Sequence, residues 1–150
     1  MSSFEIRHEV GIKTTPEKLF SALTRPEELA RWWTRDTRGE STAGSSLEFW
    51  FGDFCQKMIV SKLNPNTLVH WKVTKDGVPE WENTEIEFLL EEDKESSQVL
   101  VHFRHFGWKS NTGMLAHCNT KWAVFLLSLK DLAETGTGKP YPEDLQINHY

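Results

Sequence analysis

The chain has 150 residues, of which 38% are apolar and 26% charged, and its formal net charge is -5. This length and composition predict one soluble domain over residues 1–150, and they exclude a disordered chain. The acidic balance argues against nucleic acid as a partner, because phosphate backbones are bound by basic surfaces.

Neither the start of the chain nor its cysteine content points to export. The opening MSSFEIRHEV lacks the basic and apolar regions of a signal peptide, and no apolar run approaches the roughly 18 residues of a membrane span. Cys55 and Cys118 are the only cysteines, which is too few for a disulfide scaffold. We therefore expect a cytoplasmic protein with two free thiols and no membrane span.

The predicted elements begin with a strand and two short helices. Residues 4–12, FEIRHEVGI, alternate apolar and polar side chains as a half-buried strand does. Two segments that start with Thr-x-Pro-Glu, at Thr14 and Thr24, then predict two helices in tandem. Each threonine can form a capping box with the glutamate three residues later, and Thr15 before Pro16 is the alternative cap of the first helix.

The middle of the chain predicts a strand meander. Residues 35–45 are polar and rich in turn formers, which predicts a loop with at most one short strand. Five segments that alternate apolar and polar residues follow, separated by turn residues: 46–51, 55–63, 67–73, 84–92 and 98–106. Strands joined by such short turns are typical of an antiparallel sheet.

The last element has the period of a helix. From about residue 111 to residue 135, apolar side chains recur three and four positions apart. Gly136 is a suitable C-terminal cap, and Pro140 ends the pattern. We expect the polar tail YPEDLQINHY to be loosely held.

These elements together predict an α+β helix-grip fold. A curved antiparallel sheet of six or seven strands wraps on the long C-terminal helix, and two short helices follow the first strand. The segments TTPEKLFSALTRPEELARWW and WAVFLLSLKDLAETGTGKPYP, with the meander between them, resemble homologues of the activator of the heat-shock-protein ATPase. That family belongs to the SRPBCC superfamily of START-like and birch-pollen-allergen-like domains. The resemblance covers nearly the whole chain, although only Gly44 stands where members carry a glycine pair.

The resemblance implies a deep apolar cavity between the sheet and the long helix, which superfamily members use to bind lipids, hormones and polyketides. The chain has seven tryptophans and nine phenylalanines, so it has either a bulky core or rings around a cavity. Alternation and helical spacing direct seven of these rings into this space, and Trp33 is placed at its rim. The predicted ligand-binding residues are Trp33, Phe49, Phe51, Trp71, Phe88, Phe103, Trp122 and Phe125. An ordinary place in the core is the alternative for each of them.

The pair Trp32-Trp33 has three explanations: a core anchor, a pocket wall or an exposed stacking platform. Neighbours on a helix diverge by about 100°, which predicts that the two side chains serve different surfaces. Trp32 continues the apolar stripe and is expected in the core, and Trp33 is expected at the pocket. The platform is the weakest of the three explanations.

Catalytic and metal-binding motifs are absent from the sequence. There is no Gly-x-Ser-x-Gly, phosphate loop or dinucleotide fingerprint, so we expect no cofactor, and the sequence favours a protein that is not an enzyme. His102 and His105 are three apart on a strand and face opposite sides, which argues against a metal site. Four polar residues are candidates for a pocket mouth but are more typical of a surface: Asp53, Glu82, Arg104 and Asn119.

The first hypothesis for function is therefore the binding of a small apolar or aromatic molecule, lipid-like or polyketide-like, in the cavity. It expects Trp71→Ala or Phe103→Ala to weaken binding more than Trp50→Ala does. The alternatives are a protein-interaction module of the chaperone-ATPase-activator type and an enzyme that acts on an apolar substrate. A homodimer is also left open. A cavity of about 300 Å³ or more favours the first hypothesis.

Overall fold

One antiparallel sheet of seven strands forms the body of the molecule in a computed structural model, which describes residues 3–148. The strand order is β1-β7-β6-β5-β4-β3-β2. The elements in chain order are β1 (Phe4–Ile12), α1 (Pro16–Thr24), α2 (Pro26–Leu29), β2 (Asp36–Gly39), β3 (Ser46–Phe51), β4 (Phe54–Asn64), β5 (Leu68–Val73), the 3₁₀ turn η1 (Pro79–Trp81), β6 (Glu85–Asp93), β7 (Gln98–Trp108) and α3 (Gly113–Thr135). The predicted α+β helix-grip fold is confirmed.

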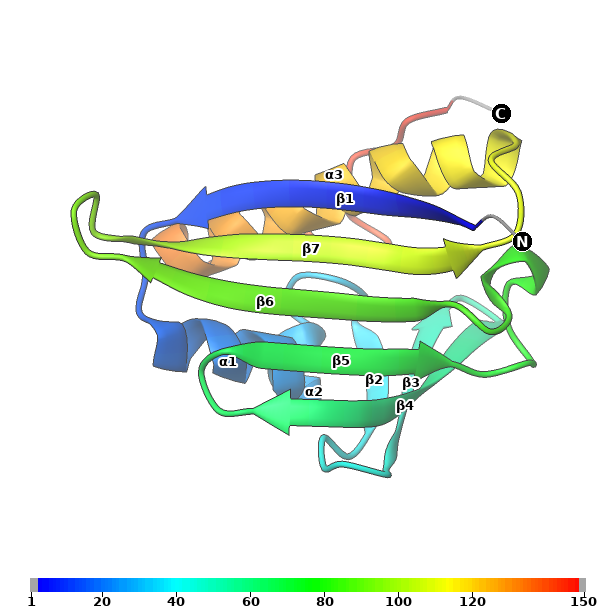
Figure 1. Cartoon of the computed structure of the whole chain (residues 1–150), viewed down its shortest axis with the longest axis horizontal. Coiled ribbons are helices and arrows are strands. Elements are labelled where there is room, and N and C mark those ends of the chain that lie inside the picture. Colours follow the sequence, from blue (N-terminus) through cyan, green and yellow to red (C-terminus); the bar gives the residue numbers. More distant parts are fainter. Residues whose placement is uncertain (1–2, 149–150) are drawn as a thin grey trace.

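The helices cover one face of the curved sheet (Figure 1). Helix α3 packs beside β1 at one edge, and α1 packs against β5 and β6 in the middle. The strands turn their apolar side chains toward the helices: Val99, Val101 and Phe103 of β7 are at most 2% exposed. This shared inner face is where a cavity between sheet and helix has to lie.

The starts of the two short helices differ in their capping. Thr15 caps α1, because its Oγ1 accepts a hydrogen bond from the Lys18 backbone N at 3.2 Å, and Pro16 is the first helical residue. The prediction of a second capping box, between Thr24 and Glu27, is wrong. Thr24 is the last residue of α1 and donates its hydroxyl to the Phe20 carbonyl at 2.8 Å, and Arg25 precedes α2 without a side-chain cap. Helix α2 is a single turn of four residues.

Helix α3 ends as the sequence predicts. Its C-terminal cap is Gly136 in the left-handed conformation, φ 87°, and the Gly136 N–H donates to the Leu132 carbonyl at 2.9 Å. A residue without a side chain adopts this φ at little cost. The helix begins at Gly113, two positions later than predicted.

The described part of the tail after α3 is held by hydrogen bonds, so the prediction of a loosely held segment is wrong for it, and residues 149 and 150 of that segment lie outside the described residues. The Tyr141 N–H donates to the Trp33 carbonyl at 2.7 Å, and the Tyr141 carbonyl accepts from the Arg35 N–H at 3.2 Å. The Lys139 N–H donates to Ser128 Oγ at 2.7 Å. The tail therefore returns along α3 and joins the segment after α2.

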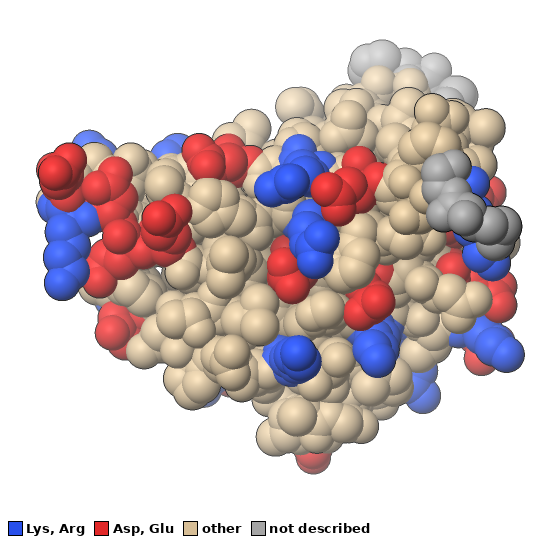
Figure 2. Space-filling view, viewed as in Figure 1, with Lys and Arg blue, Asp and Glu red and all other residues tan. Residues whose placement is uncertain are grey.

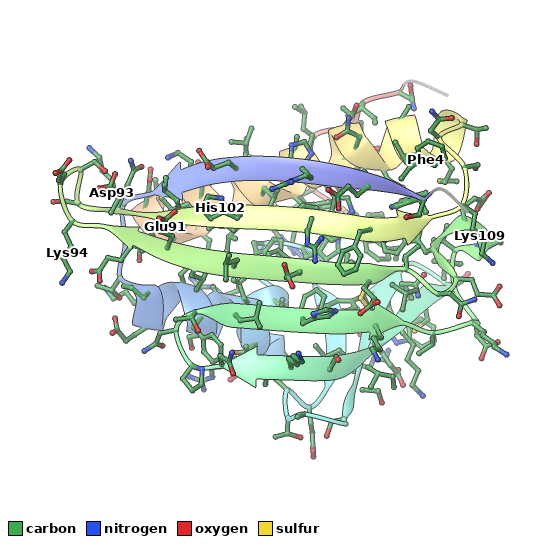
Figure 3. All side chains as sticks on the ribbon, in the orientation of Figure 1. Phe4, Glu91, Asp93, Lys94, His102 and Lys109 are labelled. Atoms are coloured by element: carbon green, nitrogen blue, oxygen red, sulfur yellow. The ribbon has the colours of Figure 1, made fainter. Side chains whose placement is uncertain are left out.

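The outer face of the sheet carries charges of both signs. Figure 2 shows acidic and basic side chains side by side over β1, β7, β6 and β5, with acidic groups gathered at the β6–β7 turn. Glu91 and His102 lie next to each other on this face (Figure 3), with Glu91 Oε1 2.8 Å from His102 Nε2. The apolar side chains of the sheet thus lie on the opposite face, which the helices cover.

Candidate functional site: an aromatic pocket between sheet and helix

A pocket of about 290 Å³ lies between the sheet, the 3₁₀ turn η1 and the first half of α3. Aromatic and aliphatic side chains form most of its wall, and it is open to solvent on one side. The lining residues are Trp33, Phe51, Phe54, Gln56, Val78, Trp81, Met114, His117, Cys118, Lys121, Trp122 and Phe125. A concave apolar site with few polar groups has the usual character of a small-molecule site.

Four of the eight sequence-predicted residues lie on this wall: Trp33, Phe51, Trp122 and Phe125. The structure places the other four in the closed core behind it, at most 2% exposed: Phe49, Trp71, Phe88 and Phe103. The two groups pack directly on each other. The ring centroids of Trp33 and Phe49 are 4.2 Å apart, and those of Phe103 and Trp122 are 4.5 Å apart. The core rings therefore support the wall.

The adjacent tryptophans Trp32 and Trp33 both point inward, so the prediction that they diverge is wrong. Helix α2 ends at Leu29, and both tryptophans lie in the turn that follows it. The two indoles stack, with centroids 6.1 Å apart and planes 17° apart. Trp32 is in the core, as expected, and its Nε1 donates to the Ala22 carbonyl at 2.8 Å. Trp33 is on the pocket wall.

Sequence reasoning missed eight wall residues: Phe54, Gln56, Val78, Trp81, Met114, His117, Cys118 and Lys121. Four of them belong to α3, and spacing was an available signal, since Met114, Cys118 and Lys121 share the helical face of Phe125. Val78 and Trp81 belong to the β5–β6 connection, which has no periodicity to follow. None of the four polar candidates for the mouth lies on the wall.

Gln56 is the buried polar group of the pocket. It occupies an inward position of β4 and is 1% exposed. Its Oε1 accepts a hydrogen bond from the Val78 N–H at 2.8 Å, and its Nε2 donates to the Lys57 carbonyl at 3.1 Å. These two bonds fix the amide orientation and leave one Nε2 proton for a ligand, because a carboxamide has two N–H donors.

The amide of Gln56 has room because residue 77 is glycine. A Cβ at Gly77 would overlap the Oε1, Cδ and Nε2 atoms of Gln56. We expect Gly77→Ala to displace the amide and to lower the free energy of unfolding by about 1–3 kcal/mol, the cost of a buried polar group without partners. Urea unfolding measures this difference.

Gly113→Ala is the matched control for that substitution. A Cβ at Gly113 meets no atom within 4 Å, and the residue is the first of α3. Alanine at this helical position is expected to be neutral or slightly stabilising. Equal destabilisation by both substitutions would contradict the role assigned to Gly77.

A buried hydrogen-bond network holds two tryptophans of the wall. Trp122 Nε1 donates to His105 Nδ1 at 3.2 Å, so His105 carries its proton on Nε2, which is 2.8 Å from Thr84 Oγ1. The Thr84 hydroxyl donates to the Trp81 carbonyl at 2.5 Å. Burial lowers the pKa of His105 from 6.5 to about 3. His105 is therefore a neutral structural group beneath the pocket.

Cys118 is the thiol of the pocket wall. It is 7% exposed, and Trp81 Nε1 is 3.3 Å from its Sγ. Burial raises the pKa of this thiol above its ordinary value, so the reactive thiolate is disfavoured at neutral pH. Both cysteines are free, and Cys118 contributes polarizable surface instead of a nucleophile.

Residues 3–148 contain neither a candidate metal site nor a membrane-spanning helix. No cluster of three His, Cys, Asp or Glu side chains in that range has the arrangement to hold a metal ion. No helix within the same residues is long and apolar enough to cross a membrane.

The sheet, the gripped helix and the ring-lined pocket between them define a helix-grip domain. Residues 13–134 match the family model described as Activator of Hsp90 ATPase homolog 1-like protein. The chain belongs to this family, which confirms the resemblance seen in the sequence.

Solved structures extend the comparison. The Aha1 dimer of Colwellia psychrerythraea is 44% identical, with a TM-score of 0.83, and the match covers 90% of this chain and 99% of that chain. The AHSA1-like protein of Rhizobium etli is 22% identical, with a TM-score of 0.72 and coverages of 99% and 95%. CalU16 of Micromonospora echinospora is 19% identical, with a TM-score of 0.67 and coverages of 87% and 73%. The last two show the fold alone. No curated protein matches the chain.

Proposed function

We propose that this chain binds a small, flat apolar molecule, aromatic and lipid-like or polyketide-like, in the pocket between the sheet and α3. The observation that carries the proposal is the pocket itself: about 290 Å³ of open space beside a core whose other rings are closely packed. A cavity of roughly 150 Å³ holds a benzene molecule. Twice that volume suits two fused rings.

The chemistry of the wall favours binding over catalysis. The polar side chains that reach it are Gln56, His117, Cys118 and Lys121. Gln56 does not titrate, and the raised pKa of Cys118 makes it a poor nucleophile. Lys121 is paired with Asp144. These groups orient a ligand more readily than they activate one, and the two free cysteines suit a cytoplasmic protein.

Filling the pocket provides the test. Val78 is a half-buried wall residue in the β5–β6 connection, so a larger side chain there projects into the cavity. We expect Val78→Phe to weaken the binding of 2-naphthamide, an uncharged two-ring probe, at least tenfold, because ring and ligand cannot share the space. Isothermal titration calorimetry measures the dissociation constants.

Leu89→Phe is the control for the same added volume. Leu89 is 45% exposed on β6, on the face away from the helices. The control is expected to bind the probe as the unaltered protein does. Retention of full affinity in Val78→Phe would place the ligand elsewhere and overturn the proposal.

A second candidate function is contact with a chaperone or with another copy of the chain. Its support is the 44% identity to a protein named Aha1 and described as a dimer. Three exposed leucines, Leu89, Leu127 and Leu145, are apolar surface for such a contact. Analytical ultracentrifugation tests the homodimer, and a monomer at all concentrations would exclude it. Either contact can coexist with a ligand in the pocket.

A further inference from the structure

The mouth of the pocket carries an imidazole and an ammonium group from one face of α3. His117 and Lys121 are four residues apart, so they lie one above the other on the helix, and both line the pocket. Lys121 Nζ lies 5.0 Å from the centroid of the Phe125 ring, which is also on the wall. The ammonium group is thus held at the boundary between the apolar pocket and solvent.

Two of the three Lys121 N–H donors have partners in the tail. Nζ donates to Asp144 Oδ2 and to the Leu145 carbonyl, the latter at 3.2 Å. An ammonium group has three donors, and the hydrogen bonds of residues 3–148 account for only these two. His117 Nδ1 is 3.5 Å from the amide nitrogen of Asn148, which leaves Nε2 as its second ring nitrogen. Each of these two side chains therefore has a nitrogen that can donate a hydrogen bond to a carboxylate at the mouth of the pocket.

The countercharge of Lys121 lies behind it. The Asp144 side chain is 1% exposed and is not part of the pocket wall, so the ion pair turns its positive end toward the pocket. Asp144 Oδ1 is buried and has no hydrogen-bond partner among the described residues. Glu80 acts electrostatically on Cys118, but its side chain is exposed and outside the wall. Among residues 3–148, no acidic side chain lines the pocket itself.

We propose that the ligand of this pocket is an aromatic acid whose carboxylate binds Lys121 and His117 at the mouth while its rings fill the aromatic interior. The inference rests on the proposed function and adds its chemical class. Rings pack among Trp33, Trp122 and Phe125, and the acid remains at the solvent side, where its charge keeps part of its hydration. A neutral ligand of the same shape loses the contact with the ammonium group.

The test compares 2-naphthoate with 2-naphthamide, two probes of one shape that differ in charge. Calorimetry at low salt is expected to give a dissociation constant at least fivefold lower for 2-naphthoate. Binding of 2-naphthamide with equal or higher affinity would overturn the acid preference and leave the proposed function standing. Binding of neither probe would overturn both.

Three variants identify the charge that decides the preference. Asp144→Asn keeps the shape of the side chain and leaves Lys121 unopposed, so 2-naphthoate should bind about threefold to fivefold more tightly, while 2-naphthamide is unaffected. The double variant Lys121→Met with Asp144→Asn should lose the preference without leaving a buried charge alone. Lys62→Met, an exposed lysine on β4, controls for net charge. Weaker 2-naphthoate binding in Asp144→Asn, or an unchanged preference in the double variant, would overturn the proposal.

Discussion

Trp33→Ala is expected to lower the free energy of unfolding by about 3–5 kcal/mol, the usual cost of removing a buried tryptophan. Trp33 is 2% exposed, and its ring both lines the pocket and packs against the rings of the core. Its centroid is 4.2 Å from that of Phe49, 5.0 Å from that of Trp122 and 5.9 Å from that of Trp71. Urea unfolding monitored by circular dichroism measures the loss.

Trp50→Ala is the matched control for this prediction. Trp50 is half-buried on β3, with Nε1 3.0 Å from Glu48 Oε1 and the Arg38 guanidinium 4.8 Å from the ring centroid. Such surface contacts contribute about 1 kcal/mol. Similar losses in the two variants would contradict the assignment of Trp33 to the core and pocket wall. An unchanged free energy of unfolding in Trp33→Ala would favour an exposed stacking platform at this residue instead.

The second large effect is a loss of stability on mild acidification. His105 has a pKa of about 3 in the folded protein and an ordinary value of 6.5. Its contribution is therefore fully present above pH 6.5 and is lost as the pH falls toward 3, because the unfolded chain then binds the additional proton. Between pH 7.5 and pH 5.0 the free energy of unfolding is expected to fall by about 2 kcal/mol from this histidine alone.

His105→Gln separates this histidine from the other titrating groups. Glutamine does not titrate, so the variant should be less stable at pH 7.5 but should lose most of the decrease between pH 7.5 and pH 5.0. Carboxyl groups with lowered pKa, such as Glu134 beside Lys13 and Lys130, lose their contribution only as the pH falls through and below about 4.5. Urea unfolding at the two pH values measures the difference. An unchanged pH dependence in the variant would contradict the buried, neutral state of His105.

The fold was predictable because each element has a local signal. Strand alternation, the Pro16 helix start and the long apolar stripe that ends at Gly136 each depend on residues close together in the chain. The order of β2 to β7 follows because each strand pairs with its neighbour in the chain, whereas the pairing of β1 with β7 joins distant parts of the sequence. Errors occurred where tertiary contacts decide, as in the tail that Tyr141 joins to Trp33.

The site was predictable only in part, because alternation identifies which side chains face inward and not which of them pack together. Phe49 and Phe51 both precede the β3–β4 turn, but Phe49 is closed in the core and Phe51 lines the pocket. Trp81 reaches the wall through a 3₁₀ turn that no periodic pattern predicts. Gln56 did leave a signal: a polar residue at an inward strand position marks a buried group that needs partners.

The most direct measurement is an NMR titration of the indole N–H signals of the seven tryptophans with 2-naphthamide. Assignment by single Trp→Phe variants distinguishes the signals. We expect shifts for Trp33, Trp81 and Trp122, which line the pocket, and a constant position for Trp50 on the outer face. Shifts confined to Trp50, or no shift at any indole at millimolar probe, would contradict a ligand site between the sheet and α3.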